Sequence, residues 1–274
     1  MTQPALNSSL VQLLKCRIEG DEFTLPVLPA VATEVLATVN SDDCDARCLA
    51  EIVQRDPALA AGVLRIVNSA QYAPNEPIVS LIQAIGRMGL SALRDMVMAI
   101  AVEGAVFYVE GHDAYVTAAW RHAHLTGQLA QEIARIRRSN VEAAFLAGLL
   151  HDVGIPVVLQ GLIDLGESEG HAVDMPLIEA AVDALHADLG ARLIDEWGLP
   201  EWTRAAALYH HAPEEAPEHG ELVSTVALAD ALSYWILDGD CEGMPPGLEH
   251  AEALDLYADD LEELKERAVE LLTP

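Results

Sequence analysis

An apolar run that ends in an adjacent histidine and aspartate constrains this fold more than any other feature. Residues 144–150 form the run, His151-Asp152 follow it directly, and Val153-Gly154 come next. A carboxylate buried at a helix end without a partner costs on the order of several kcal/mol. The chain must therefore supply groups that hold both side chains, and a divalent metal ion would hold both.

The hydrophobic pattern predicts helices nearly throughout the chain. The 274 residues are 51% hydrophobic but only 5% aromatic, which is typical of a helical protein packed with small aliphatic side chains. The β-branched pair Val157-Val158 is too short to support a sheet. We therefore expect an all-α fold. Helical patterns cover residues 28–40, 49–53, 57–67, 81–109, 120–136, 141–150, 175–193, 203–210, 223–237 and 254–268.

A polar, turn-like break at residues 111–113 separates two parts of the chain. We expect an N-terminal helical part over residues 1–110 and a second helical part over residues 111–274. The second part ends in an amphipathic helix, in which apolar residues recur at alternating steps of three and four.

Two short motifs in the first part are typical of helix ends. Asp56-Pro57 matches an N-cap followed by a first-turn proline, and Asn68-Ser69 matches the end of the same helix. These residues could instead form a surface for a partner, but capping explains them more simply. We expect Asp56 and Asn68 to satisfy backbone groups.

The acidic charge argues against several function classes. The chain has a formal net charge of −29 and an isoelectric point near 4.4. This field repels phosphate backbones and anionic lipids, so we expect neither nucleic acid nor a membrane as a partner. A membrane span is not expected either, because the best apolar stretch, residues 96–102, falls far short of the ~20 apolar residues that a bilayer needs.

The N-terminus and the cysteines indicate a cytoplasmic protein. No basic region precedes an apolar segment at the start of the chain, so a secretion signal is not expected. The four cysteines, Cys16, Cys44, Cys48 and Cys241, are scattered. Cys44 and Cys48 are spaced by four, but no second pair completes a zinc site, so free thiols are expected.

Histidines and aspartates in the helical segments are candidate metal ligands. We expect one or two divalent transition-metal ions, and nitrogen-rich ligation favours iron, manganese, zinc or nickel over magnesium. Two ions roughly 3.5–4 Å apart can clamp a phosphate and lower the pKa of a bridging water. The first ion is expected at His122, His151, Asp152 and Asp230, and the second at His186, His210 and possibly His211, with Asp152 as the catalytic residue.

Simpler interpretations of the same residues stay open. His122 alone is more often a satisfied core histidine than a ligand. His210-His211 could interact with the dipole at a helix C-terminus, and Asp230 could bond to its neighbours on a helix face. His124 lies about 200° around a helix from His122 and is left out of the expected site.

The candidate ligands and several motifs in the first part of the chain resemble a known family. The pattern of His122, His151-Asp152 and Asp230 resembles the signature of the HD superfamily of metal-dependent phosphohydrolases. The first part narrows the resemblance to the HDOD domain, the HD-related output domain of bacterial signalling proteins, over roughly residues 15–240. The motifs that carry it are residues 25–29, 55–59, 67–70 and 86–93 together with 149–154 and 227–230.

This resemblance implies an all-α, HD-domain-like helical bundle and a role in bacterial signal transduction, with other signalling proteins as partners. Many members of the family lack the HD ligands and are regarded as non-catalytic, whereas this sequence retains them. The related HD-GYP phosphodiesterases carry a lysine shortly after the HD pair, and Ile155 stands there instead. Glu214-Glu215 occupy the loop after His211, which contains no Gly-Tyr-Pro.

Three functions follow as expectations. The first is a regulatory HDOD protein that keeps an HD-type metal site and acts mainly through protein contacts. The second is a metal-dependent phosphohydrolase acting on a nucleotide or another phosphoester, and the third is a helical scaffold without metal. We expect weak or no hydrolysis of cyclic di-GMP, because Ile155 replaces a phosphate-contacting lysine and Glu214-Glu215 repel a polyanion. The oligomeric state is left open.

Overall fold

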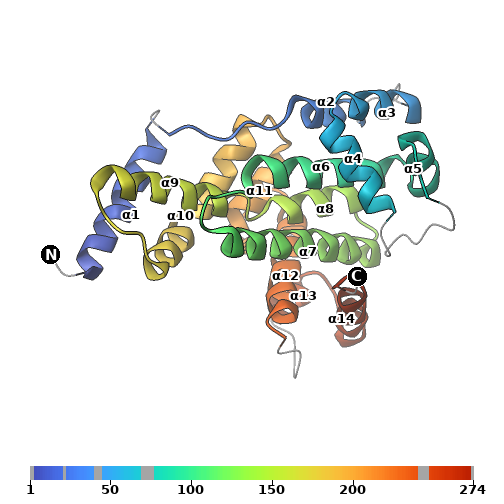
Figure 1. The fold of residues 1–274 in the computed structure, drawn as a ribbon. Coiled ribbons are helices and arrows are strands. Elements are labelled where there is room, and N and C mark those ends of the chain that lie inside the picture. The colour runs from blue at the N-terminus through green and yellow to red at the C-terminus, as the bar shows by residue number, and fades with distance from the viewer. Residues whose placement is uncertain (1–2, 21–22, 40–44, 69–76, 240–246, 273–274) are drawn as a thin grey trace. The chain divides into compact units, whose positions relative to one another are not determined.

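The structure is a computed structural model that describes residues 3–20, 23–39, 45–68, 77–239 and 247–272. Helices make up nearly all of its regular structure, and no strand occurs in the described residues, so the all-α prediction is confirmed (Figure 1). The elements are α1 (Gln3–Glu19), α2 (Ala30–Val39), α3 (Ala46–Gln54), α4 (Pro57–Val67), α5 (Leu81–Met88), α6 (Leu90–Val106), α7 (Asp113–Arg137), α8 (Val141–Leu150), α9 (Gly154–Glu169), α10 (Met175–Glu196), α11 (Glu201–Tyr209), the 3-10 helix η1 (Pro213–Glu215), α12 (Gly220–Leu237), α13 (Leu248–Ala253) and α14 (Ala258–Leu272).

The chain forms two compact units. Val27–Ala105 and Val269–Pro274 form one, which we call the α2–α6 unit, and Met1–Pro26 with Val106–Ala268 form the other, which we call the α7–α12 unit. Helix α1 packs on α9 and α10, so it belongs to the α7–α12 unit although it precedes residue 110. The indole nitrogen of Trp197 donates to the carbonyl of Pro26 at 2.8 Å, which fastens the end of this N-terminal segment to α10.

The α2–α6 unit is built around an apolar core. Its buried side chains are almost all aliphatic, and Val53, Val63 and Leu93 are completely buried. Asp56 accepts bonds from the backbone N–H groups of Ala58 and Leu59, so the predicted cap of α4 is confirmed.

Asn68 ends α4 as expected. Its Nδ2 donates to the carbonyls of Leu64 and Ile78, and its Oδ1 accepts from the backbone N–H of Ile78. The side chain therefore satisfies the helix end and also holds the segment before α5. Ser69, which completes the expected motif, lies outside the described residues.

In the α7–α12 unit, helix α7 packs on α8 and α12, and α9 packs on α10. A close contact between glycines sets the first of these packings. A Cβ on Gly148 would lie 2.8 Å from Cα of Gly127 and 2.9 Å from the carbonyl oxygen of Thr126, closer than real side chains approach. Because both positions are glycine, α7 and α8 can approach closely enough for His122 on α7 to lie beside His151 at the end of α8.

A second glycine contact joins α9 to α10. A Cβ on Gly154 would collide with the backbone carbonyl of His186 and would lie 2.8 Å from the backbone nitrogen of Gly190. Gly154 therefore lets the start of α9 touch the backbone of α10. This contact brings Asp152, two residues earlier, beside His186.

Within the described residues, two helical stretches are long and apolar enough to span a membrane by length and composition. They are Val141–Glu169, with a mean hydropathy of 1.6 and 89% of its window buried, and Gly220–Leu237, with 1.2 and 56%. The expectation that residues 96–102 form the best apolar stretch is thus wrong. The first stretch is interrupted by a turn at His151-Asp152, and its burial is that of a core helix pair.

Candidate metal centre

The structure brings all seven expected ligands into one cluster in the α7–α12 unit. Three lie in helix interiors and four directly follow helix ends, and five of the six helices that run from α7 to α12 contribute. His122 comes from α7, His151 and Asp152 follow α8, His186 lies on α10, His210 and His211 follow α11, and Asp230 lies on α12. All are buried except His211, which is exposed.

The first half of the cluster combines two imidazoles and two carboxylates. The Nε2 atoms of His122 and His151 are 3.3 Å apart. Oδ1 of Asp230 is 2.9 Å from Nε2 of His122 and 3.5 Å from Nε2 of His151. Oδ2 of Asp152 lies 3.3 Å from Nε2 of His151. Four donors from three separate parts of the sequence thus converge.

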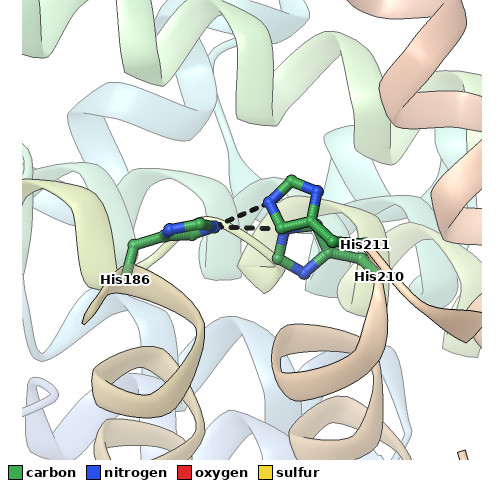
Figure 2. Close-up of side chains that lie close together, drawn as sticks. All are labelled: His186, His210 and His211. Atoms are coloured by element: carbon green, nitrogen blue, oxygen red, sulfur yellow. Dashed lines mark hydrogen bonds between the residues drawn. The ribbon is translucent and has the colours of Figure 1, made fainter. Parts of the chain in front are cut away.

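The second half of the cluster is made of three imidazoles. Figure 2 shows the ring of His186 facing the rings of His210 and His211. Its Nε2 atom is 3.3 Å from Nε2 of His210 and 3.0 Å from Nε2 of His211. These three nitrogens form a compact donor set, and they include the residue about which the sequence left a choice, His211.

Asp152 joins the two halves. Its Oδ2 atom faces His122 at 3.6 Å and His151 at 3.3 Å. Its Oδ1 atom faces His186 and His210, each at 3.4 Å. One carboxylate thus presents one oxygen to each half, which is the placement of a ligand shared between two cations.

Backbone carbonyls orient three of the imidazoles. Nδ1 of His151 bonds to the carbonyl of Gly148 at 2.7 Å, and Nδ1 of His186 bonds to that of Val182 at 2.7 Å. Nδ1 of His210 bonds to the carbonyl of Ala207 at 2.9 Å. A carbonyl only accepts, so each Nδ1 carries the proton and each Nε2 offers its lone pair to the cluster, as metal-ligating histidines do.

The donor set fits a divalent transition-metal ion. Two ligand atoms ~2.1 Å from one tetrahedral ion stand ~3.4 Å apart, close to the separations seen here. Nδ1 of His186 and Nδ1 of His210 both carry a proton, so their Nε2 lone pairs face one another at 3.3 Å and repel unless a cation lies between them. In addition, Nδ1 of His122 is buried without a hydrogen-bond partner, and Oδ1 of Asp230 makes no hydrogen bond of suitable geometry although Nε2 of His122 lies 2.9 Å away.

These contacts also bear on the simpler interpretations. His122 is not a satisfied core histidine, because its Nδ1 has no partner and its Nε2 faces other ligands. His210 does bond to the last carbonyls of its own helix, but the same ring turns its Nε2 into the cluster. His124 packs against Trp120 and Phe145 instead.

Titration in the cluster reflects the balance of burial and charge. Burial opposes protonation of His151, but Asp152 and Asp230 raise its pKa well above the ordinary value. Partial desolvation by the surrounding protein lowers the pKa of His211 to about 4, helped by the charges of His210 and His186, so this ring is neutral near pH 7. In the metal-free protein a proton on His151 therefore compensates the carboxylates, and a metal ion would replace it.

Two cavities open onto the cluster. The larger, of about 540 Å³, is lined by Asp152, His186 and His211 among others, and the smaller, of about 350 Å³, by His122. Both are bordered by Ile155, Tyr115 and Tyr234. A ligand in either cavity would therefore reach the candidate metal ligands directly.

Sequence reasoning missed six polar residues that line these cavities. Most of them lie on the same helices as the ligands, at helical spacings from them, which is the signal that could have found them. Tyr234 stacks on His122 with ring centroids 3.9 Å apart. The six residues are Tyr115 and Arg121 on α7, Glu179 and Asp183 on α10, Tyr234 on α12, and Asp238 directly after α12.

The acidic pair expected beside the site lies elsewhere. Glu214 and Glu215 belong to the 3-10 helix η1 and border neither of the two cavities. The carboxylates that line the larger cavity besides Asp152 are Glu179 and Asp183. The cavity is acidic as expected, but its charge comes from α10. Ile155 does line both cavities, at the position where a lysine was expected in the related phosphodiesterases.

Cys16 and Cys48 are free thiols, and Cys44 and Cys241 lie outside the described residues.

Comparison with known proteins identifies the family. The family model of the HDOD domain matches residues 25–213. An uncharacterized protein of Treponema pallidum (strain Nichols) is 28% identical over 225 residues, which are 79% of this chain and 43% of that protein. The chain thus spans less than half the length of this curated relative.

Solved structures share the fold. One protein of Shewanella amazonensis SB2B, provisionally named a metal-dependent phosphohydrolase, matches with a TM-score of 0.74 and 18% identity, over 97% of this chain and 98% of that one. A provisionally named phosphohydrolase of the same organism matches with a TM-score of 0.69 and 25% identity, over 94% of both chains. A provisionally named signal transduction protein of Marinobacter aquaeolei VT8 matches with a TM-score of 0.72 and 24% identity, over 98% of this chain and 63% of that one.

Proposed function

This chain belongs to the HDOD domain family, and we propose that it is a regulatory protein whose buried centre binds divalent transition-metal ions and hydrolyses a small phosphoester. One observation carries the proposal. Asp152 presents one oxygen to each of two donor groups and also lines a cavity of about 540 Å³. A cluster that served only to stabilise the fold would not need an open cavity at its shared ligand.

The chain's residues divide the task between them. His122, His151 and Asp230 would hold one ion, and His186, His210 and His211 the other, with Asp152 between them. When bound, such ions supply Lewis acidity and a water of lowered pKa. The cavity admits the ester to this centre, and Tyr234, stacked on His122, borders the path.

Nitrogen-rich ligation supports iron, manganese, zinc or nickel as the metal. Among the seven candidate ligands five are imidazoles and two are carboxylates, which is a donor set that magnesium seldom accepts. The names of the two Shewanella proteins agree with this chemistry, because both are provisionally placed among phosphohydrolases.

A second candidate is a regulatory module that binds metal but acts through contacts with other signalling proteins, as the notion of an output domain implies. Its support is the cavity lining. Ile155 offers no charge to a phosphate, and Glu179 and Asp183 repel a polyanion. The provisional name of the Marinobacter relative also refers to signal transduction.

The test begins with elemental analysis of the protein purified without added metal. We expect at least about one transition ion per chain and turnover of a small phosphomonoester such as p-nitrophenyl phosphate. Asp152→Ala should abolish both, whereas Asp188→Ala, which removes an exposed carboxylate from α10, should leave both unchanged. A contaminating phosphatase would survive the first substitution.

Different failures separate the candidates. Metal-loaded protein that hydrolyses no phosphoester would leave the regulatory module as the function. A metal content below about 0.1 per chain, unchanged after supplementation with manganese or iron, would overturn metal binding itself. Cyclic di-GMP is expected to be a poor substrate in every case, with a rate roughly two to three decades below an enzyme that contacts its phosphate by a charged group.

A further inference from the structure

We propose that the preferred ester carries a positive charge beside its phosphate, so that the substrate class is the aminoalkyl phosphomonoesters, of which phosphoethanolamine is the simplest probe. This inference rests on the proposed function and specifies its substrate. It follows from what lines the larger cavity beyond the metal ligands.

The larger cavity has an acidic wall beside its candidate metal ligands. Glu179 and Asp183 stand on α10 one helical turn apart, and Asp183 lies one turn before the ligand His186. Both carboxylates are exposed, and no lysine or arginine is among the residues that line this cavity. A group that extends from the metal centre into this cavity thus meets negative charge that nothing in its lining neutralises.

Two tyrosine rings line the same cavity. Tyr115 and Tyr234 line both cavities, and their π-faces attract cations at distances up to about 6 Å. Burial raises the pKa of Tyr115, and the charges of Asp152 and Glu179 raise it further, so its ring lies within the field of these carboxylates. Neutral phenol rings and carboxylates together form the kind of wall that recognises an ammonium group.

The candidate metal centre accounts for the phosphate end of the substrate. Asp230 is nine-tenths buried, and its Oδ1 makes no hydrogen bond of suitable geometry although Nε2 of His122 lies 2.9 Å away, which fits a cation held between them. Metal ions there would attract the phosphate, while the α10 wall would repel a second one. The charges of the site therefore match a substrate with its phosphate at the metal centre and a cationic group about one substituent away. The same charges oppose a dinucleotide, which carries a second phosphate.

The smaller cavity differs in charge. Arg121 and Asp238 both line it, so it is close to neutral. The ammonium group is therefore expected on the α10 side rather than the α7 side. A cavity of about 540 Å³ lies within the range that holds small ligands.

The reaction adds water across the ester bond. The water oxygen bonds to phosphorus, the bond between phosphorus and the ester oxygen breaks, and this oxygen takes up a proton. The products are inorganic phosphate and an aminoalcohol, with no oxidant or further reactant required.

The experiment compares phosphoethanolamine with ethyl phosphate, which has the same two-carbon chain without the amine. Binding to the metal-loaded protein is measured by isothermal titration calorimetry, and kcat/KM is measured for both esters. We expect at least about a tenfold preference for phosphoethanolamine in both readouts, from two ion pairs and the aromatic rings. The Glu179→Gln/Asp183→Asn variant should lose the preference and bind ethyl phosphate at least as tightly as the unaltered protein, because it removes negative charge that repels the phosphate.

Asp188→Asn is the matched control, because it removes the same charge from an exposed position of α10 outside both cavities. It should retain the preference, and metal content and melting temperature should be alike in all variants. If the double variant does not fold, the single variant Asp183→Asn replaces it, with a preference reduced at least about twofold.

The outcomes are distinguishable. Equal binding and turnover of the two esters would overturn the inference and leave the hydrolase intact. A preference that survives in the double variant would also overturn it, because the amine would then be recognised elsewhere. Binding of phosphoethanolamine with the expected preference but without turnover of either ester would support the site and overturn the hydrolytic function.

Discussion

The two units of this protein bury different kinds of side chains. In the described residues of the α2–α6 unit, Asp95 is the one buried charged group, and Arg94 pairs with it at 3.0 Å. The α7–α12 unit buries a cluster of ionisable groups, which are His122, His151, Asp152, His186, His210 and Asp230. Apolar burial alone can build the first unit, whereas the second bears an electrostatic cost that only a bound ion or proton can offset.

The difference between the two units indicates which of them holds the functional site. A buried cluster of like donors destabilises a fold unless something binds to it, and a core of aliphatic side chains does not need such a ligand. Substitutions in the two units should therefore differ in kind. Those in the α7–α12 unit should change metal content, and those in the α2–α6 unit should change only stability.

The largest effect is expected from Asp152→Ala. Because Oδ1 and Oδ2 of Asp152 face different halves of the cluster, this substitution should remove both ions, whereas His211→Ala should remove at most one. Metal content by elemental analysis, with circular dichroism to verify folding, checks the prediction. Full metal content in Asp152→Ala would show that the carboxylate is held by its histidine neighbours alone.

A pair of glycine substitutions should give the next largest contrast. Gly154→Ala places a methyl group against the backbone carbonyl of His186, which cannot move aside, so a loss of about 3 kcal/mol or more in stability is expected together with lost metal. Gly62→Ala in α4 meets the side chain of Ile100, with Cδ1 at 3.0 Å and Cγ2 at 3.3 Å, and no backbone atom. Since that side chain can rotate and alanine favours a helix, this change should stay within about 1 kcal/mol.

Thermal melts of the two variants decide the point. Similar destabilisation by both would mean that close packing around Gly154 is no tighter than that in the α2–α6 unit. Retained metal in a destabilised Gly154→Ala variant would separate the packing of α9 on α10 from the geometry of the site.

Chelation should reveal the link between metal and stability. An ion present at about 100 times its dissociation constant stabilises the folded state by about 2.7 kcal/mol, or roughly 5–10 °C in melting temperature for a chain of this size. Adding EDTA should remove this amount from the unaltered protein and change nothing in Asp152→Ala. A melting curve of the unaltered protein that ignores the chelator would contradict metal-linked stability.

Much of the fold follows from local patterns in the sequence. Helix α8 begins and ends where its apolar run predicts, and Asp56 caps α4 because the N-cap rule depends on adjacent residues alone. Helix α9 was not predicted, since Gly154, Pro156 and Val157-Val158 near its start have low helix propensity. Tertiary burial overrides that preference, because every residue from Gly154 to Leu159 is buried.

The candidate site was only partly predictable. Residues whose types ligate metals could be named from the sequence, and the fold brings them together. The cavity wall could not, because Glu179 and Asp183 resemble any other exposed acids until α10 is placed against the cluster. For the same reason Glu214 and Glu215 were expected beside the site on sequence proximity, although the chain turns them away from both cavities.

The smallest expected effect sharpens the comparison from the side of the α2–α6 unit. Asp56→Ala removes the carboxylate that accepts from Ala58 and Leu59, so it should destabilise the protein by about 1 kcal/mol. Asp56→Asn should cost much less, because an asparagine oxygen caps a helix equally well. Metal content should be unchanged in both variants, since none of the seven candidate metal ligands lies in this unit. Loss of metal in Asp56→Ala would show that the two units are coupled in stability. The prediction that substitutions in the α2–α6 unit change only stability would then be wrong.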